Sequence, residues 1–342
     1  MFDPAPDALI DANGRPRLGI YGEPLRRLNL HDFDYRAVAP WPFRWSRRLS
    51  RLAIKRWQYI GLVSDSLVVG AAVVDIGYVA KAFAYCYLRE EGRVRDFSFD
   101  DFTHGATQYS ATSVEGVSEY KSGGKLIRFE NTLVDGKRRI TIDIPGGFSG
   151  EYSLDENDFT PLCAVTRNGL RGFNYCHKAM GLPVEGMVRV GDRQIDLAAD
   201  NALGGLDWTA GCAAHETYWN WASAAGRLDD GRTVGLNLVS GINDRGFTEN
   251  GYWIDGRPVK VDVVHFEYDE KAILQPWTIR SNDGRVDLRF EPEGERSENL
   301  NFGVLASRFH QPFGVYTGTL TVDDAPRPVR LYGFAEEHEA RW

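Results

Sequence analysis

The sequence lacks the motifs that usually hold metals and common cofactors. It contains no CxxC pair, no HxH or HExxH sequence, no GxxxxGK[ST] loop and no GxSxG turn. These absences exclude the usual signatures of zinc sites, of phosphate-binding loops and of the commonest hydrolase nucleophile. We therefore expect a protein that uses neither a metal nor a cofactor.

Cysteine is also scarce, with four residues in 342: Cys86, Cys163, Cys176 and Cys212. Each lies beside apolar or small residues, which is typical of buried thiols in a reducing compartment. Residues 1–7 show neither the basic nor the apolar segment of a secretory signal. No run of about 18 apolar residues is present, so no transmembrane helix is expected. These features predict a cytoplasmic protein.

Excess positive charge is absent. The net charge is −8, which argues against a surface for nucleic acid or anionic membranes. One basic stretch includes Arg44–Arg48, Arg51, Lys55 and Arg56. It has two interpretations, a site for an anion or partner, or a solvated helix face or turn. With 43% hydrophobic and 26% charged residues, the chain is typical of a globular protein.

Long stretches of helical periodicity are missing, and alternation with a period of two dominates. Trp57–Val63, Leu67–Ile76 and Tyr78–Leu88 read as consecutive strands. Asp-Gly pairs flanked by such runs are typical of two-residue hairpin turns. Four are present: Asp135-Gly136, Asp230-Gly231, Asp255-Gly256 and Asp283-Gly284. The predicted class is all-β.

The pattern predicts two barrel-like halves preceded by an arm. Residues 1–45 are irregular and rich in Pro and Arg, and Asp155–Asp158 interrupts the strand pattern. We expect an arm at 1–45, a first half at 46–160 and a second at 161–342. A propeller is less favoured because the residues around the turns do not repeat. Closed antiparallel barrels would instead remove the edges of long apolar strands.

Groups able to do chemistry concentrate in His215–Trp221, Gly241–Asn243 and Thr248–Asn250. These segments combine an imidazole, carboxyls, a phenol, indoles and carboxamides, a mixture that suits a pocket for a largely apolar ligand. A barrel core with satisfied polar groups is the alternative interpretation.

A two-residue turn at Asp230-Gly231 would pair Tyr218 with Asn243 and Ala224 with Asn237. One face would then carry Glu216, Tyr218, Asn220, Asn237 and Asn243. The other would carry His215, Trp219, Trp221, Leu236 and Leu238. We expect the first face to line the cavity.

Four residues are the catalytic candidates. Glu216 or Glu249 would act as acid or base, because an apolar cavity raises a carboxyl pKa toward neutrality. His215 and Tyr218 would orient a water or a polar group. The alternatives are a hairpin-end carboxylate for Glu249 and a hydrogen-bonded core residue for His215.

The candidate ligand-binding residues are Trp219, Trp221, Asn220, Asn237, Asn243, Asn250, His177 and Lys178. The two indoles would stabilise developing positive charge through their π faces. His177-Lys178 would place a cation near the pocket, or would simply end a strand.

Five segments resemble a bacterial family described only as a domain of unknown function: Lys55–Gly61, Gly181–Gly186, Trp219–Trp221, Thr248–Asn250 and Gly333–His338. The resemblance extends from about Gly14 to Trp342. That family is in turn distantly similar to lipocalin-like double-barrel proteins, which include carotenoid 1,2-hydratase (hydroxyneurosporene synthase) and fungal pericyclases. The similarity implies two consecutive lipocalin-like β-barrels with a ligand cavity, and cofactor-free chemistry on isoprenoid or polyketide substrates. The hydratases have a His-x-Trp pair, and the nearest match here is His215 with Trp219 and Trp221, at a different spacing.

The main hypothesis is therefore a cofactor-independent hydratase/lyase or isomerase that acts on a hydrophobic small molecule. One alternative is a non-catalytic intracellular protein that binds a lipid or isoprenoid. The other is a carbohydrate-active β-protein, which would need two carboxyls about 5–10 Å apart across an open cleft. A closed apolar cavity would favour the first two, whereas an open groove lined by tryptophans would favour the third.

Overall fold

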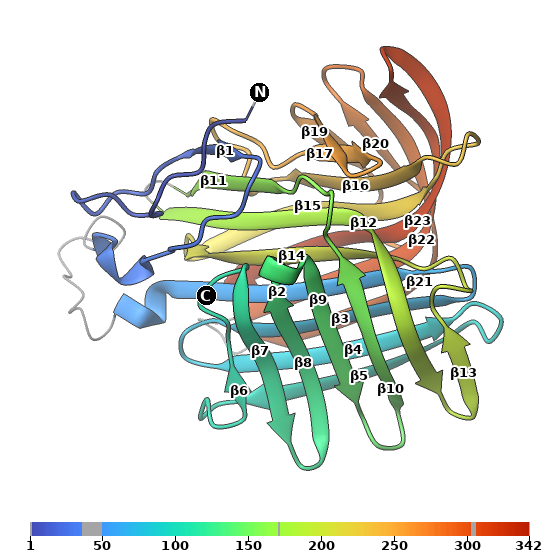
Figure 1. Cartoon of the computed structure of the whole chain (residues 1–342), viewed down its shortest axis with the longest axis horizontal. Helices are drawn as coiled ribbons and strands as arrows, with labels where there is room; N and C mark the ends of the chain where they lie inside the picture. The colour runs from blue at the N-terminus through green and yellow to red at the C-terminus, as the bar shows by residue number, and fades with distance from the viewer. Residues whose placement is uncertain (1, 36–49, 170–171, 302–305, 342) are drawn as a thin grey trace.

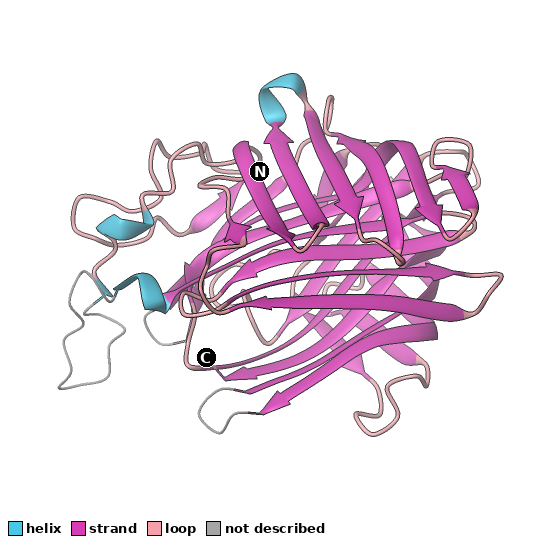
Figure 2. Ribbon diagram, turned by 90° about the horizontal axis from the view of Figure 1, so that it is seen from below, coloured by secondary structure: helices cyan, strands magenta, loops and turns pink. Residues whose placement is uncertain are grey.

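The computed structural model describes residues 2–35, 50–169, 172–301 and 306–341. Within these ranges the regular structure is almost entirely antiparallel β-sheet, as Figure 2 shows. The helices described there are short 3-10 turns: η1 (Leu30–Asp32), η3 (Ser50–Ala53) and η4 (Leu133–Asp135). The expected all-β class is confirmed. In the described ranges, no helix has both the length and the apolar character needed to cross a membrane.

The first sheet has 14 strands and curls over on itself, so that the blue strands of Figure 1 lie behind the green ones. Its main path, in sheet order, is β5 (Arg93–Asp101), β4 (Ala80–Leu88), β3 (Leu67–Asp75), β2 (Ile54–Val63), β14 (Leu203–Cys212), β12 (Gly172–Val190), β10 (Phe148–Asp155), β9 (Lys137–Asp143), β8 (Lys125–Thr132), β7 (Glu115–Ser122) and β6 (Thr107–Gln108). Three strands lie off this path: β1 (Gly19–Tyr21), β11 (Leu162–Asn168) and β13 (Arg193–Asp196).

The second sheet has nine strands, drawn in yellow to red in Figure 1. Its order is β18 (Arg257–Lys260), β17 (Gly251–Ile254), β16 (Thr233–Ser240), β15 (Glu216–Arg227), β23 (Ala325–Arg341), β22 (Ala306–Val322), β21 (Val286–Asn301), β20 (Trp277–Ser281) and β19 (Val264–Glu267). The sequence therefore produces two consecutive antiparallel, barrel-like sheets, as expected.

The chain passes from the first sheet to the second between Cys212 and Glu216, whereas the expected division lies at residue 160. The physical reason is the pairing of β12, which joins β10 on one side and β14 on the other. Strand β14 in turn pairs with β2 near the start of the sheet. The first barrel thus needs strands that come after residue 160.

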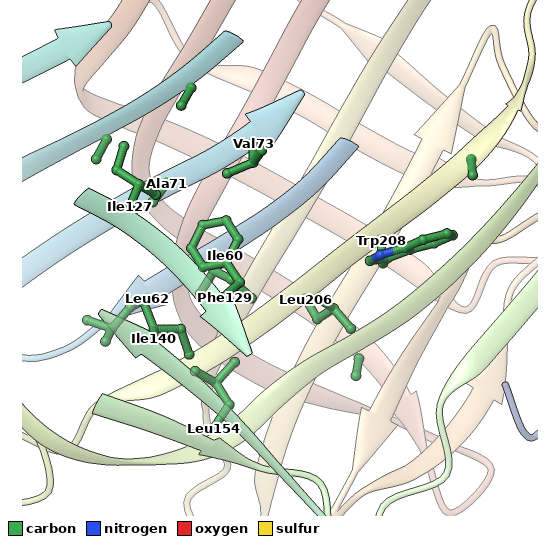
Figure 3. Close-up of a cluster of buried hydrophobic side chains, with 14 of the residues drawn as sticks. Ile60, Leu62, Ala71, Val73, Ile127, Phe129, Ile140, Leu154, Leu206 and Trp208 are labelled. Carbon is green, nitrogen blue, oxygen red and sulfur yellow. The ribbon is translucent and has the colours of Figure 1, made fainter. Parts of the chain in front are cut away.

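Alternating residues of the first sheet fill its interior. Ile60 and Leu62 of β2 point inward and meet Phe129 of β8, as Figure 3 shows, and all three are at most 1% exposed. Tyr59, one position away on β2, belongs instead to a cluster on the outer face. Strand alternation therefore gives β2 one face for the barrel core and one for the contact with the second sheet.

The N-terminal arm packs against the first barrel. In residues 2–35, Leu9, Leu25 and Phe33 are buried in the same core as the barrel strands. The backbone N–H of Leu25 donates to the Tyr175 hydroxyl at 3.1 Å. The basic segment Arg44–Arg48 lies outside the described residues.

Two members of the basic stretch are described with internal partners. Lys55 donates to the backbone carbonyls of Leu52 and Ile76, at 3.0 and 2.6 Å. Arg56 forms an ion pair with Asp75 at 3.0 Å. Both cations therefore interact with other groups of the fold.

The two sheets pack back to back through an apolar cluster from both outer faces. Its members include Tyr59, Val68, Tyr85, Met180, Trp219, Trp221, Phe313 and Phe334. The backbones approach most tightly where β12 crosses β16. A Cβ atom on Gly235 would lie 1.8 Å from the Met180 carbonyl oxygen, so only glycine fits there.

Replacing Gly235 by alanine should therefore lower the free energy of unfolding by about 1–3 kcal/mol, because the added methyl group forces the sheets apart. Urea unfolding followed by tryptophan fluorescence measures the loss. Gly105→Ala is the control, since its Cβ would meet only the Thr103 hydroxyl at 3.1 Å. Equal stability of the Gly235→Ala and Gly105→Ala proteins would contradict the close approach of the sheets.

Candidate functional site

A cavity of about 260 Å³ lies between the outer faces of the two sheets. Its walls are mainly aromatic and aliphatic, and the aromatic side chains are Trp57, Tyr59, Phe83, Phe102, Trp219, Trp221 and Phe309. β2 and β4 supply the wall on one side, and β15 and β22 supply it on the other. The cavity is thus shared between the two sheets, and its lining suits a small hydrophobic molecule.

The first sheet places a buried cation in this cavity. Lys178 of β12 is the cross-strand partner of Asp207 of β14, and its ammonium nitrogen lies 2.7 Å from Asp207 Oδ2. Glu249 Oε1 lies 3.2 Å from the same nitrogen. Burial acts to lower the pKa of Lys178, but the two carboxylates outweigh burial and hold that pKa above its usual value. Lys178 therefore remains charged at neutral pH.

Glu249 is held in place by amide side chains. Asn243 Nδ2 donates to Glu249 Oε2 at 3.0 Å. Asn243 Oδ1 in turn accepts from Thr166 Oγ1 at 3.0 Å and from Asn174 Nδ2 at 2.9 Å. Lys260 donates to the backbone carbonyl of Thr248, one residue before Glu249, at 2.8 Å. The carboxylate thus faces the cavity from a well-braced segment.

The second sheet contributes a further carboxyl group to the cavity, that of Glu336 on β23. Its Oε1 accepts from Trp219 Nε1 at 2.6 Å, and its Oε2 accepts from Gln311 Nε2 at 3.0 Å. Burial raises the pKa of Glu336 to about 7, although these two hydrogen bonds favour the ionised form. Near neutral pH, Glu336 can therefore both donate and accept a proton.

His338 lies two residues further along β23, on the same face as Glu336. Its ring centroid is 4.2 Å from that of Trp219, its cross-strand partner. Its Nε2 lies 2.8 Å from Ser307 Oγ, and its Nδ1 lies 4.0 Å from Glu336 Oε1. Burial lowers the pKa of His338 to about 3, and the charge of Arg296 acts in the same direction. The ring is therefore neutral at physiological pH.

Four of the residues expected from the sequence line this cavity: Lys178, Trp219, Trp221 and Glu249. Trp219 and Trp221 are 9% and 5% exposed, and both belong to the cluster between the sheets. Trp57 is only partly buried, and it stacks parallel to Trp219 with ring centroids 6.3 Å apart.

The other three catalytic candidates lie on the surface. The side chain of Glu216 is 70% exposed and pairs with Arg341 at 3.1 Å. His215 is exposed, and Tyr218 is 38% exposed, with its hydroxyl bonded to Asn220 Oδ1 at 3.0 Å. For Glu216 and Tyr218 the reason is strand alternation, because they share the face of β15 opposite to the tryptophans. His215 precedes the first residue of β15, so the strand does not hold it on the tryptophan face. Glu216, Tyr218 and Asn243 do line one pocket, of about 160 Å³, but this pocket is separate from the cavity of the tryptophans, and Tyr218 is its one aromatic side chain among the described residues.

Two of the expected ligand-binding asparagines brace the site from behind. Asn237 Oδ1 accepts from Trp221 Nε1 at 2.8 Å, and its Nδ2 donates to the Glu249 carbonyl at 2.8 Å. Asn250 Oδ1 accepts from the Val239 backbone N–H at 2.6 Å. Neither lines the cavity, so both are positioning residues. Asn243 likewise does not line the cavity and holds Glu249 in position by a hydrogen bond.

Asn220 and His177 point away from the cavity. Asn220 Nδ2 donates to the Tyr268 hydroxyl at 2.9 Å. His177 precedes Lys178 on β12 and faces the interior of the first barrel, where its nitrogens lie 2.9 Å from Ser113 Oγ and 2.9 Å from Glu156 Oε1. This group resembles a Ser-His-acid triad, but the cavity does not reach it. It is a hydrogen-bonded part of the barrel core.

The hairpin of β15 and β16 differs by one residue from the expected register. Its loop has five residues rather than two, closed by a bond from the Leu228 N–H to the Arg232 carbonyl at 2.9 Å. Asn237 therefore pairs with Ser223 rather than with Ala224. The shift places Asn237 on the same face as Trp221, which a two-residue Asp-Gly turn does not predict.

Four polar residues that line the cavity are not among the site residues predicted from the sequence: Asp207, Gln311, Glu336 and His338. Glu336 and His338 alternate along one strand, within the segment Gly333–His338 that supports the family resemblance. This spacing of two could have indicated that both side chains point to the same side of the sheet, because residues two apart on a strand share a face. Asp207 and Gln311 carry no such local signal.

The sequence matches the family described as a domain of unknown function (DUF2804) over residues 4–342. No curated protein matches the sequence significantly. The fold is similar to several solved structures of low sequence identity, and these similarities concern the fold alone.

One similar structure is CghA with Sch210972, at 11% identity and a TM-score of 0.57, covering 84% of this chain and 88% of that one. Kievitone hydratase from Nectria haematococca has 14% identity and a TM-score of 0.56, covering 83% and 88%. A putative AttH from Nitrosomonas europaea has 16% identity and a TM-score of 0.50, covering 83% and 91%. The expected lipocalin-like double-barrel fold is confirmed.

Proposed function

The chain belongs to the DUF2804 family, and we propose that it is a cofactor-independent hydratase/lyase or isomerase acting on a hydrophobic small molecule. One observation carries the proposal. A carboxyl group, Glu336, lies buried in a cavity with mainly apolar walls and has a pKa of about 7. A general acid is most effective when its pKa lies near the working pH.

The proposed reaction begins at a carbon–carbon double bond held against the aromatic wall. The Glu336 proton passes to one carbon, and the π electrons form the new C–H bond. The positive charge left on the other carbon faces the indoles of Trp219 and Trp221, whose π faces stabilise cations. Water then bonds to that carbon and returns a proton to Glu336, so that the net change is the addition of one water. Loss of a neighbouring proton instead gives an isomer.

Lys178 supplies the hydrogen-bond donor of the site. An ammonium group has three N–H bonds, and two carboxylates, those of Asp207 and Glu249, lie within ion-pair distance. The group can direct a donor at an oxygen of the substrate or at the attacking water. The fold similarity to kievitone hydratase, a protein named as a hydratase, agrees with this type of reaction.

Exchange of hydrogen into carbon tests the proposal against a non-catalytic binding protein. The full chain is incubated in D₂O with a panel of prenylated and conjugated alkenes, and the products are analysed by mass spectrometry. A hydratase adds the mass of D₂O, and an isomerase adds deuterium at carbon. Binding without deuterium at carbon, for every compound that binds, would contradict the enzyme and favour the binding protein.

The rate should depend on pH through Glu336. The acid acts in its protonated form, so kcat/KM should be high below pH 7 and fall as the pH rises through about 7, the pKa of Glu336. The measurement is a pH profile of kcat/KM for a substrate without ionisable groups. A flat profile from about pH 6 to 8 would remove Glu336 as the acid.

A further inference from the structure

Among the side chains that line the inner end of the cavity, negatively charged groups outnumber positively charged ones. Lys178 is paired with two carboxylates, Asp207 at 2.7 Å and Glu249 at 3.2 Å. His338 adds no positive charge at neutral pH, because burial lowers its pKa to about 3. Of the described residues that line this end, two therefore carry carboxylates and one carries a cation, before any ionisation of Glu336. Lys260, which donates to the Thr248 carbonyl behind Glu249, is a further cation but does not line the cavity.

The same imbalance recurs toward the mouth of the cavity. Lys81 forms ion pairs with Glu298 and, at 3.4 Å, with Asp100. Arg296, whose side chain is only 2% exposed, forms ion pairs with Glu298 and Asp96, both at 3.0 Å. In the described part of the chain this group contains two cations and three carboxylates, of which Asp96 does not line the cavity, so each cation is already neutralised.

The aromatic walls act in the same direction as the charges. The rings of Trp57 and Trp219 are parallel within 5°, and the Arg296 guanidinium lies 4.0 Å from the Phe83 ring centroid. The face of an aromatic ring carries partial negative charge, which attracts cations and repels anions. An anion that enters this cavity would lose its hydration without gaining a counterion.

We propose that the cavity selects its ligand by charge, accepting uncharged and cationic hydrophobic molecules and excluding anionic amphiphiles such as fatty-acid carboxylates. This inference rests on the proposed function, because it takes the same cavity as the ligand site, and it narrows the class of substrate. The substrate is thus uncharged or cationic before the proton transfer, and the site favours the positive charge that the reaction creates.

Three probes of similar shape test the selection: naphthylmethylammonium, naphthylmethanol and naphthoate. Isothermal titration calorimetry of the full chain near neutral pH should give the tightest binding for the ammonium and the weakest for the carboxylate. One net charge at about 10 Å and an effective dielectric constant of about 20 corresponds to about 10-fold in affinity per step. Equal affinities, a preference for naphthoate, or no binding of any probe would overturn the proposal.

Charge-removing variants locate the effect. Asp207→Asn and Glu249→Gln each remove one negative charge at nearly constant size, and each should reduce the ammonium-to-carboxylate affinity ratio by about 5-fold or more. Asp100→Asn, at a mouth side chain that is 49% exposed, provides the same readout if the buried variants do not fold. Glu291→Gln is the control, because this exposed carboxylate lies outside the cavity. An unchanged ratio in every folded cavity variant would overturn the proposal.

The two proposals can fail separately. Charge selection is an equilibrium property of the cavity and is read from binding alone. Deuterium incorporation is read from turnover. Turnover without charge preference would contradict charge selection and leave the proposed function intact. Charge-selective binding without turnover would contradict the proposed function and leave charge selection intact.

Discussion

Replacing Glu336 by glutamine should lower turnover by about 10²–10⁴-fold while the affinity for the ligand changes little. Glutamine keeps the size of the side chain, and its amide can still accept from Trp219 Nε1, which donates to the carboxyl at 2.6 Å. It cannot deliver a proton of suitable acidity. The measurement is kcat under saturating substrate, together with the dissociation constant from calorimetry. The pH dependence near 7 should disappear from any residual activity.

Glu339→Gln is the matched control for this prediction. Glu339 lies on the same strand, but its side chain is 56% exposed and pairs with Arg308 at 3.1 Å. Its substitution should leave both constants unchanged. If the surface carboxyl that the sequence favoured were the acid, the loss would appear in Glu216→Gln instead. Unchanged turnover in Glu336→Gln would refute the assignment of the acid.

Replacing Arg138 by methionine should lower the free energy of unfolding by about 3–5 kcal/mol, because it leaves the Glu156 carboxylate buried without its strongest partner. Both side chains are 1% exposed, and Arg138 Nε lies 2.5 Å from Glu156 Oε2. Arg138 also donates to the Ser113 carbonyl at 2.7 Å and to Asn131 Oδ1 at 2.6 Å. Urea denaturation at neutral pH measures the loss. A loss below about 1 kcal/mol would show that the pair does not stabilise the barrel.

The double variant Arg138→Met/Glu156→Gln is the control for the buried charge. It removes both ions, so it should recover part of the stability lost in Arg138→Met. If the double variant is instead less stable by the sum of the two single losses, the charge pair is not the cause.

The same pair sets a dependence of stability on pH. Burial acts to raise the pKa of Glu156, but Arg138 and His177 outweigh it and lower this pKa from 4.5 to about 2. The stabilisation is therefore complete above about pH 4.5 and is lost as the pH falls toward 2. The wild-type protein should lose more stability over this interval than the Glu156→Gln protein.

The sequence by itself determined the secondary structure of this protein to a large extent. The strands expected at Trp57–Val63, Leu67–Ile76 and Tyr78–Leu88 correspond to Ile54–Val63, Leu67–Asp75 and Ala80–Leu88. Alternation and turn chemistry are properties of neighbouring residues, so they can be read from the chain. For the same reason the sequence correctly separated Glu216 and Tyr218 from the tryptophans on the two faces of one strand.

Only the tertiary structure decided which face of that strand lines the cavity. The choice depends on how β15 packs against the first sheet, through contacts such as the stacked pair Trp57 and Trp219, which lie 162 positions apart. The candidate acid is defined in the same way, because the pKa of Glu336 depends on burial between two sheets and on Gln311 from a neighbouring strand. Neither burial nor long-range proximity is a local property of the sequence. The residue types were therefore visible from the start, and their chemical roles follow only from the fold that brings them together.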